Sequence, residues 1–208
     1  MPRILVAAAC LLLAGCVQSP VPLESGEKVS DPALIGIWKS DFDGDPMVAT
    51  IYRQANGDLV ADIQAYWEPG PTAATMQFQV VLARFGEHRY MSFRSRDMGP
   101  SYALARYLFQ NKDRFCVHAA YSEKLLSDLQ AKALPGELKP DRHVSNVELR
   151  ASAEQLRSYF ARHGAAAFHD SPLLAFERVT SAVLPPPRSQ ADRDRGEPGY
   201  DEITPCRR

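Results

Sequence analysis

The residues best suited to nucleophilic chemistry are Cys116 and His118, which stand two positions apart. Alternate residues of a β-strand point to the same side, so a strand over residues 114–121 would place both side chains on one face. A histidine can take the proton of a thiol and leave the thiolate that cysteine enzymes use. Neighbouring places on one strand are not the usual arrangement of such a pair. We therefore interpret Cys116 as a core cysteine and His118 as a buried histidine with a hydrogen-bond partner.

Two further groups have side chains of the types that bind metal ions. Residues 41–45 carry three alternating aspartates, as at the start of a calcium-binding loop, but Pro46 and Tyr52 occupy the places of its glycine and its closing glutamate. His163 and His169 are six residues apart, whereas two metal ligands on one helix stand three or four apart. We also find no glycine-rich cofactor loop and no Gly-x-Ser-x-Gly motif. We therefore predict a protein that is not an enzyme, with no catalytic residue, no metal site and no cofactor.

The first residues have the pattern of an export signal. Arg3 precedes an apolar run over residues 4–13, and small residues then lead to Cys16. A membrane-spanning helix needs roughly 20 apolar residues, so this run is too short to stay in the membrane. The segment Leu13-Ala14-Gly15-Cys16 resembles the lipobox of bacterial lipoproteins. That resemblance implies cleavage before Cys16 and acyl chains on its thiol and on the new amino terminus.

The same resemblance implies a place in the cell envelope. In bacterial lipoproteins a residue other than aspartate after the acylated cysteine, here Val17, implies export to the outer membrane, where we expect the domain to face the periplasm. Several acyl chains make such an attachment stable. We therefore predict a signal peptide over residues 1–15, a lipid anchor at Cys16 with the membrane as partner, and a flexible tether through residue 31.

Charge and composition narrow the remaining classes. The precursor has a formal net charge of −1, and loss of the signal removes Arg3 but no acidic residue, which leaves −2. A chain so near neutrality is not expected to bind nucleic acid. Hydrophobic residues make up 45 % of the sequence, enough for one core in one domain, which we place at residues 32–184. Residues 185–208 begin with three prolines, are dense in charge and are predicted to be a disordered tail.

Two cysteines are left after export. Cys10 is lost with the signal and Cys16 is acylated, so Cys116 and Cys206 remain in a compartment that permits disulfides. Two alternatives stay open. A Cys116 to Cys206 bond would hold the carboxyl-terminal tail on the domain, or Cys116 is buried and free while Cys206 lies idle in the tail.

Short apolar and aromatic segments between turn residues predict an antiparallel meander. The clearest sign is Asn56-Gly57 between strands at 47–53 and 59–66, because both residues tolerate positive φ. Further strands are predicted at 77–84, 89–94, 102–109, 114–121, 144–150 and 173–179. The total of about eight or nine strands is the number that a small closed barrel needs.

Two amphipathic helices interrupt the strands. The first follows Ser122, places leucines on one face and ends before Pro135-Gly136. The second begins after Ser152, where Gln155 completes a capping box, and ends at Gly164. Both helices are expected to lie with their apolar face against the sheet.

The segment Gly36-Ile37-Trp38 resembles the Gly-x-Trp signature with which lipocalins begin their first strand. In that family the tryptophan closes one end of the barrel, and an arginine near the end of the last strand stacks on it. Arg178 stands at that place, so the resemblance implies structural roles for Gly36, Trp38 and Arg178. It implies a mainly β fold, an antiparallel meander forming a lipocalin-like barrel with two flanking helices. The extra helix after Tyr121 departs from the simple family plan and keeps an α+β open sheet as the alternative.

Two functions are open at this stage. The aromatic residues from Tyr66 to Tyr121 line either a filled core or a cavity. Our first hypothesis is an envelope-anchored lipoprotein without enzymatic activity that binds a small apolar or amphipathic ligand in its barrel. The alternative is a structural or interaction lipoprotein, a packed scaffold that contacts another envelope protein through the loop at Trp67 and the charged tail.

Overall fold

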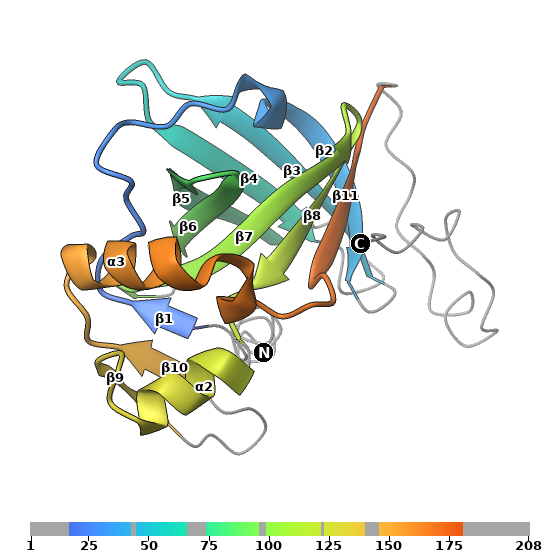
Figure 1. Cartoon of the computed structure of the whole chain (residues 1–208). Helices are drawn as coiled ribbons and strands as arrows, with labels where there is room; N and C mark the ends of the chain where they lie inside the picture. Colours follow the sequence, from blue (N-terminus) through green and yellow to red (C-terminus); the bar gives the residue numbers. More distant parts are fainter. Residues whose placement is uncertain are drawn as a thin grey trace, which may run out of the picture.

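The computed structural model describes residues 17–42, 45–65, 74–95, 99–121, 123–139 and 146–180. In these residues the fold is mainly β: eight antiparallel strands close into a barrel, and three short strands and two α-helices pack on its outside (Figure 1). The predicted lipocalin-like barrel with two flanking helices is confirmed.

The first seven barrel strands follow one another as hairpins, and the eighth comes after the elements of an outer layer. The barrel strands are β2 (Gly36–Phe42), β3 (Asp45–Arg53), β4 (Leu59–Ala65), β5 (Ala74–Phe85), β6 (His88–Ser95), β7 (Tyr102–Asn111), β8 (Arg114–Ala119) and β11 (Leu174–Arg178). Each strand from β2 to β8 pairs with the next, and β11 pairs with both β8 and β2. The alternative of an open α+β sheet is therefore wrong, because β11 leaves the barrel strands no free edge.

The hairpin between β3 and β4 forms where Asn56-Gly57 predicted it. Arg53 pairs with Leu59 across the turn. Gly57 adopts a positive φ of 86°, whereas Asn56 does not and instead accepts a hydrogen bond from the backbone N–H of Asp58 (3.0 Å). The Asn-Gly pair thus makes the turn through one left-handed glycine and one side-chain hydrogen bond.

A second layer packs on the outer wall of the barrel. It contains β1 (Val17–Ser19), α2 (Glu123–Gln130), β9 (Gly136–Lys139), β10 (Asn146–Leu149), α3 (Ala153–His163) and the 3₁₀ helix η3 (Gly164–Ala167). In this layer β1 joins β7 to β10, and β10 joins β1 to β9. The strand predicted at 144–150 therefore belongs to the outer layer and not to the barrel, and β9 was not predicted.

The predicted capping box begins α3. The Ser152 hydroxyl accepts from the backbone N–H of Gln155 (3.3 Å), and the Gln155 side chain accepts from the backbone N–H of Ser152 (2.8 Å). Gly164 follows the helix with a φ of 53°. The first helix, α2, ends at Gln130, and its predicted cap Ser122 lies outside the described residues.

Two apolar cores lie on opposite sides of the wall that β6 and β7 form. Trp38, Phe78 and Phe115 belong to the core inside the barrel. Tyr90 and Leu104 point outward from the same wall and pack with the outer layer. Figure 1 shows α3 running across this outer face. Residues 90–92 of β6 and 102–105 of β7 are thus buried on both faces, and the buried part of β7 is a continuous apolar run from Tyr102 to Ala105.

Residues 17–23, in the segment that the sequence predicted to be a flexible tether, pack against the barrel, whereas most of residues 24–30 are exposed. Val17 and Leu23 are fully buried in the outer core, and the backbone N–H of Leu23 donates to the Ser92 hydroxyl (2.9 Å). Single apolar residues among polar ones have no period, so the sequence pattern did not reveal this packing. The predicted signal peptide, the anchor Cys16 and the tail 185–208 lie outside the described residues.

Candidate ligand cavity

The barrel encloses a cavity of about 100 Å³. Its wall consists of alternate residues from β3, β4, β5, β6, β8 and β11, which point inward because successive side chains of a strand alternate. Every lining side chain is leucine, isoleucine, valine, alanine, methionine or phenylalanine. The wall offers a ligand apolar contact and no hydrogen-bonding or charged side chain.

The volume of the cavity limits what it holds. A water molecule takes roughly 30 Å³, and pockets for drug-sized ligands begin at roughly 300 Å³. The cavity therefore matches a short alkyl segment. Met47, Met76 and Met91 are part of its wall, and methionine side chains are flexible enough to repack around irregular shapes. A longer chain can enter if these side chains change rotamer.

The two ends of the barrel differ. We call the end where β8 finishes and β11 begins the mouth end. Ile63, Met76 and Phe93 line the cavity near this end and are only partly buried, as are Leu173 and Leu174. The connections 66–73 and 96–98 lie outside the described residues. Apolar side chains thus continue from the cavity to the mouth end.

A short 3₁₀ helix, η1 (Pro32–Leu34), crosses the opposite end. Leu34 is buried and forms part of the cavity wall. The indole N–H of Trp38 donates to the Leu34 carbonyl oxygen (2.8 Å), and its ring meets Phe115 edge-on at 4.7 Å between centroids. This end of the barrel is therefore closed by η1 and Trp38.

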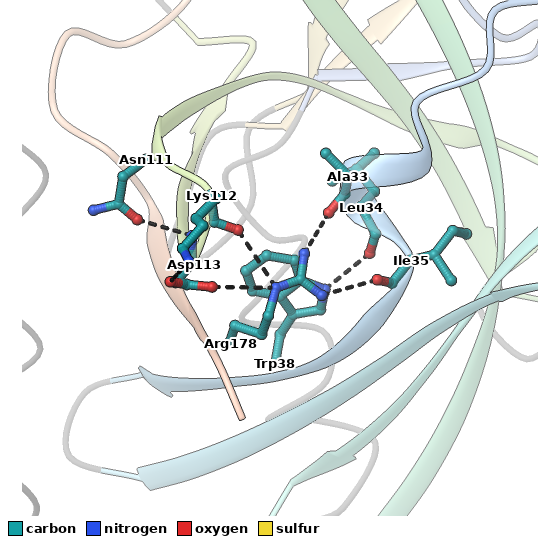
Figure 2. Close-up of polar contacts among 8 residues, drawn as sticks. All are labelled: Ala33, Leu34, Ile35, Trp38, Asn111, Lys112, Asp113 and Arg178. Carbon is teal, nitrogen blue, oxygen red and sulfur yellow. Dashed lines mark hydrogen bonds and ion pairs between the residues drawn. The ribbon is translucent and has the colours of Figure 1, made fainter. Parts of the chain in front are cut away.

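Arg178 ties the closing segment to the last barrel strand, as Figure 2 shows. Its guanidinium carbon lies 4.1 Å from the centre of the Trp38 ring. Its Nη1 and Nη2 groups donate to the carbonyl oxygens of Ile35 (3.0 Å) and Ala33 (2.7 Å), and its Nε lies 3.7 Å from an Asp113 carboxylate oxygen. The structure places Trp38 and Arg178 together as the lipocalin resemblance implied.

Gly36 lets Arg178 come this close. Its φ is 146°, a value that residues with a side chain rarely adopt, and a Cβ atom there would lie 2.4 Å from Nη1 of Arg178. A larger residue would therefore meet both a backbone strain and a steric clash.

Asp31 fixes the start of η1 to the barrel interior. Its carboxylate accepts from the backbone N–H of Ala33 (3.2 Å), from Nη1 of Arg89 (3.2 Å) and from the Tyr107 hydroxyl (3.0 Å). Burial, with Asp31 alongside, raises the pKa of Tyr107. The sequence analysis placed Asp31 in the tether, although Asp31-Pro32 is itself a helix-start pattern that could have revealed it.

Cys116 and His118 share a face of β8, but that face is the outer one. Phe115 and Val117, which alternate with these two residues along β8, line the cavity on the inner face. Cys116 takes part in a disulfide and so is not a thiolate, and its predicted partner Cys206 lies outside the described residues. The structure therefore does not make Cys116 and His118 a nucleophilic pair.

His118 is a structural link between the barrel and the outer layer. Its Nδ1 lies 3.0 Å from the His169 carbonyl oxygen, which can only accept, so Nδ1 carries the proton. Burial lowers the pKa of His118. The buried ring is thus neutral, with Nε2 unprotonated.

Sequence reasoning missed a row of buried polar groups on this outer wall. Tyr90 pairs with Arg106 across β6 and β7, and Arg106 pairs with His118 across β7 and β8. In the part of the chain that the structure describes, the Tyr90 hydroxyl, Arg106 Nε and His118 Nε2 have no hydrogen-bond partner. Burial raises the pKa of Tyr90 to about 12. These polar groups lie on the outer side of the barrel wall and the cavity lies on its inner side, so they do not line the cavity.

The aspartates of residues 41–45 and the pair His163 and His169 are the other side chains of metal-binding type. Asp41 and Asp45 lie in the β2–β3 hairpin, and Asp43 is outside the described residues. The His163 ring packs on Tyr159 (4.6 Å between centroids). His169 instead accepts, at Nδ1, a hydrogen bond from the backbone N–H of Ser171 (3.1 Å). The described ranges contain no cluster of three or more histidine, cysteine, aspartate or glutamate residues that would hold a metal ion.

A groove of about 320 Å³ lies outside the barrel, between residues 24–29 and the β3–β4 turn. Its charged residues are of both signs and are exposed except for the half-buried Asp58: Glu24, Glu27, Lys28, Arg53 and Asp58. Exposed groups of mixed sign remain hydrated and give little preference for one ligand, so the apolar cavity is the better candidate site.

No helix among the described residues has the length and apolar character needed to cross a membrane. No protein-family model, no curated protein and no solved structure matches this chain. The cavity and the sequence motifs are therefore the features from which a function is inferred.

Proposed function

We propose that this chain is a lipid-anchored envelope protein whose barrel binds one small apolar or amphipathic molecule through an alkyl or aromatic portion. The observation that carries the proposal is the cavity whose every lining side chain is apolar, with the partly buried Ile63, Met76 and Phe93 leading to the mouth end. An amphipathic ligand would place its alkyl part in the cavity and keep its polar part at that end.

The proposed location follows from the first residues. The lipobox-like segment ending at Cys16 supports acylation, and Val17 after it supports transport to the outer membrane with the domain in the periplasm. The proposed partner is a small molecule of the envelope. In this proposal the protein has no catalytic residue and uses no cofactor.

The second candidate function is a packed scaffold that contacts another envelope protein. It is favoured by the small volume of the cavity, about 100 Å³, and by Leu138 on β9, whose exposed fraction is 48 %. β9 is an edge strand of the outer layer and pairs on one side with β10. An exposed edge strand can pair with a strand of a partner.

Ligand binding is tested on the soluble chain from Val17 to Arg208, exported without the anchor and purified without detergent. Native mass spectrometry would reveal a carried molecule as an added mass that disappears on denaturation. Titration with a dansylated undecanoic acid would measure the affinity for an alkyl chain. We expect a retained mass or saturable binding of one probe per chain.

Matched variants then locate the binding. Ala61 is buried and lines the cavity, whereas Gln64 on the same strand is exposed and points outward. We expect Ala61→Leu to weaken probe binding at least tenfold, with Ala61→Phe as a larger replacement, and Gln64→Leu to leave it unchanged. A bare protein mass together with no saturable binding would overturn the proposal and favour the scaffold.

A further inference from the structure

The first described residue of the chain is held firmly in the fold. Val17 is fully buried, and β1 pairs with β10 through Val17 and Val147. On its other side β1 pairs with β7 through Gln18 and Ala103. Burial and pairing on both sides fix the position of Val17, so the preceding chain leaves the domain from a defined place.

That place is on the outer wall of the barrel, nearer to its mouth end than to its closed end, and β1 runs from there toward the mouth end. β8 pairs with β7 along one edge, and the pairing ends with Ala105 and Ala119. Just beyond that pair, the backbone N–H of Ala120 donates to the Leu104 carbonyl oxygen (3.1 Å). β1 takes over the same edge at Ala103 and Tyr102. The start of β1 therefore lies beside the end of β8 (Figure 1).

Apolar side chains of the mouth end lie directly next to the place where the start of β1 meets the end of β8. Ala103 on β7 packs with Phe93 and Leu173, and the backbone N–H of Leu173 donates to the Val117 carbonyl oxygen (2.7 Å). The opposite end is closed by η1 and Trp38. Of the two ends, the chain start thus lies nearer to the one where apolar side chains lead into the cavity.

The distances involved are short on the scale of a membrane. Adjacent Cα atoms are about 3.8 Å apart, so Cys16 lies within one residue of β1. The level of Val17 and the start of β7 at Tyr102 are two residues apart, or roughly 7 Å at the rise of a strand. The polar layer on each side of a bilayer is itself about 5 to 8 Å thick. Acyl chains on Cys16 would therefore hold the mouth end at the membrane surface.

We propose that the anchor orients the barrel with its mouth end toward the bilayer, so that the cavity takes a single alkyl chain directly from the lipid surface. This inference rests on the proposed function and names the ligand source and the docking surface. The apolar side chains of the mouth end then face lipid, and a ligand passes from the membrane to the cavity without crossing water.

Site-directed spin labelling of the full-length, lipidated chain in phosphatidylethanolamine and phosphatidylglycerol vesicles tests the orientation. Pro100→Cys and Ser171→Cys carry labels at exposed mouth-end positions, and Ala55→Cys and Glu87→Cys carry them in exposed turns at the opposite end. Collision with oxygen reports lipid, and collision with a water-soluble nickel chelate reports water. We expect the oxygen-to-nickel collision ratio to be several-fold higher for both mouth-end labels, with the unsubstituted chain as background.

A spacer variant separates orientation from mere attachment. A flexible insert of about ten glycine and serine residues between Cys16 and Val17 would let the domain rotate freely. We expect it to remove the difference between the two ends without changing the melting temperature. Equal collision ratios at both ends in the native chain would overturn the inference, and so would a difference that the spacer leaves intact.

The outcomes also distinguish this inference from the proposed function. Probe binding is measured on the soluble chain, so binding together with equal collision ratios would overturn only the orientation. A mass spectrum with no acyl chain on Cys16 would overturn the orientation and the anchoring and leave cavity binding standing. Loss of probe binding with clear orientation would overturn the ligand and keep the docking surface.

Discussion

The guanidinium carbon of Arg178 lies 4.1 Å from the centre of the Trp38 ring, although the two residues belong to the last and the first strand of the barrel. The same guanidinium donates to the carbonyl oxygens of Ala33 and Ile35 on either side of Leu34. One side chain thus holds together the strand that closes the barrel and the segment that covers its end. A cation over an indole adds ~0.5 to 2 kcal/mol, depending on desolvation.

Replacing Arg178 with alanine should lower the free energy of unfolding by about 2 to 4 kcal/mol, because a cation–π contact and charged hydrogen bonds are lost together. Arg178→Lys should lose less free energy of unfolding than Arg178→Ala but should not match the native chain, since an ammonium lacks the planar fork that reaches two carbonyls. Urea unfolding followed by tryptophan fluorescence measures both. Lys39→Ala removes the neighbouring exposed ion pair with Glu177 and should cost less than about 1 kcal/mol. An equal loss for Lys39→Ala and Arg178→Ala would contradict the assigned role.

Gly36→Ala should destabilise the fold by about 1 to 3 kcal/mol through its backbone strain alone, with the clash against Arg178 in addition. The new Cβ would lie 2.4 Å from Nη1 of Arg178, so the cost should shrink when Arg178 is already alanine. A double-mutant cycle in urea measures this coupling. Gly86→Ala is the control, because Gly86 also has a positive φ but no atom near its missing Cβ. Strict additivity of the Gly36 and Arg178 changes would sink the proposed clash.

Stability should fall as the pH drops through the range in which His118 titrates. Burial lowers its pKa in the folded chain below the ordinary histidine value of 6.5, so the folded state binds this proton less readily than the unfolded state. The stabilisation is full above pH 6.5 and is lost as the pH falls toward the lowered folded value. Arg106, His169 and Asp170 are the charged or titratable groups that act on the ring.

His118→Gln should flatten this part of the pH profile, because glutamine can still donate to the His169 carbonyl oxygen but does not titrate. Thermal melts between pH 7 and pH 5 give the slope for the native chain and the variant. An unchanged slope in His118→Gln would show that another group is responsible.

The disulfide of Cys116 is predicted to join Cys206, which would hold the carboxyl-terminal segment on the outer face of β8. Peptide mapping of the unreduced protein identifies the partner directly. If the pair is right, Cys206→Ser should lower the free energy of unfolding by about 2 to 4 kcal/mol, and adding a reductant should not lower it further. A Cys206→Ser variant as stable as the native chain would exclude this pairing as a stabilising bond.

The local elements were readable from the sequence. The Asn56-Gly57 turn and the Ser152 and Gln155 capping box each depend on a few adjacent residues, so their chemistry is visible in the order of the chain. The pairing of Trp38 with Arg178 came from the lipocalin resemblance and not from any periodicity. Asp31 was missed because the proline-rich surroundings indicated a tether, although Asp31-Pro32 begins η1.

Local patterns in the amino-acid order were enough to predict the barrel strands, the turns and the second helix, because period-two alternation, left-handed glycines and helix caps act over a few residues. Four features became visible in the folded chain: β11 closes the barrel, Cys116 and His118 face outward, residues 17–23 pack on the barrel, and a cavity of about 100 Å³ is left inside. Each of these depends on how side chains distant in the chain fill a common space, and that volume is not encoded in any local pattern.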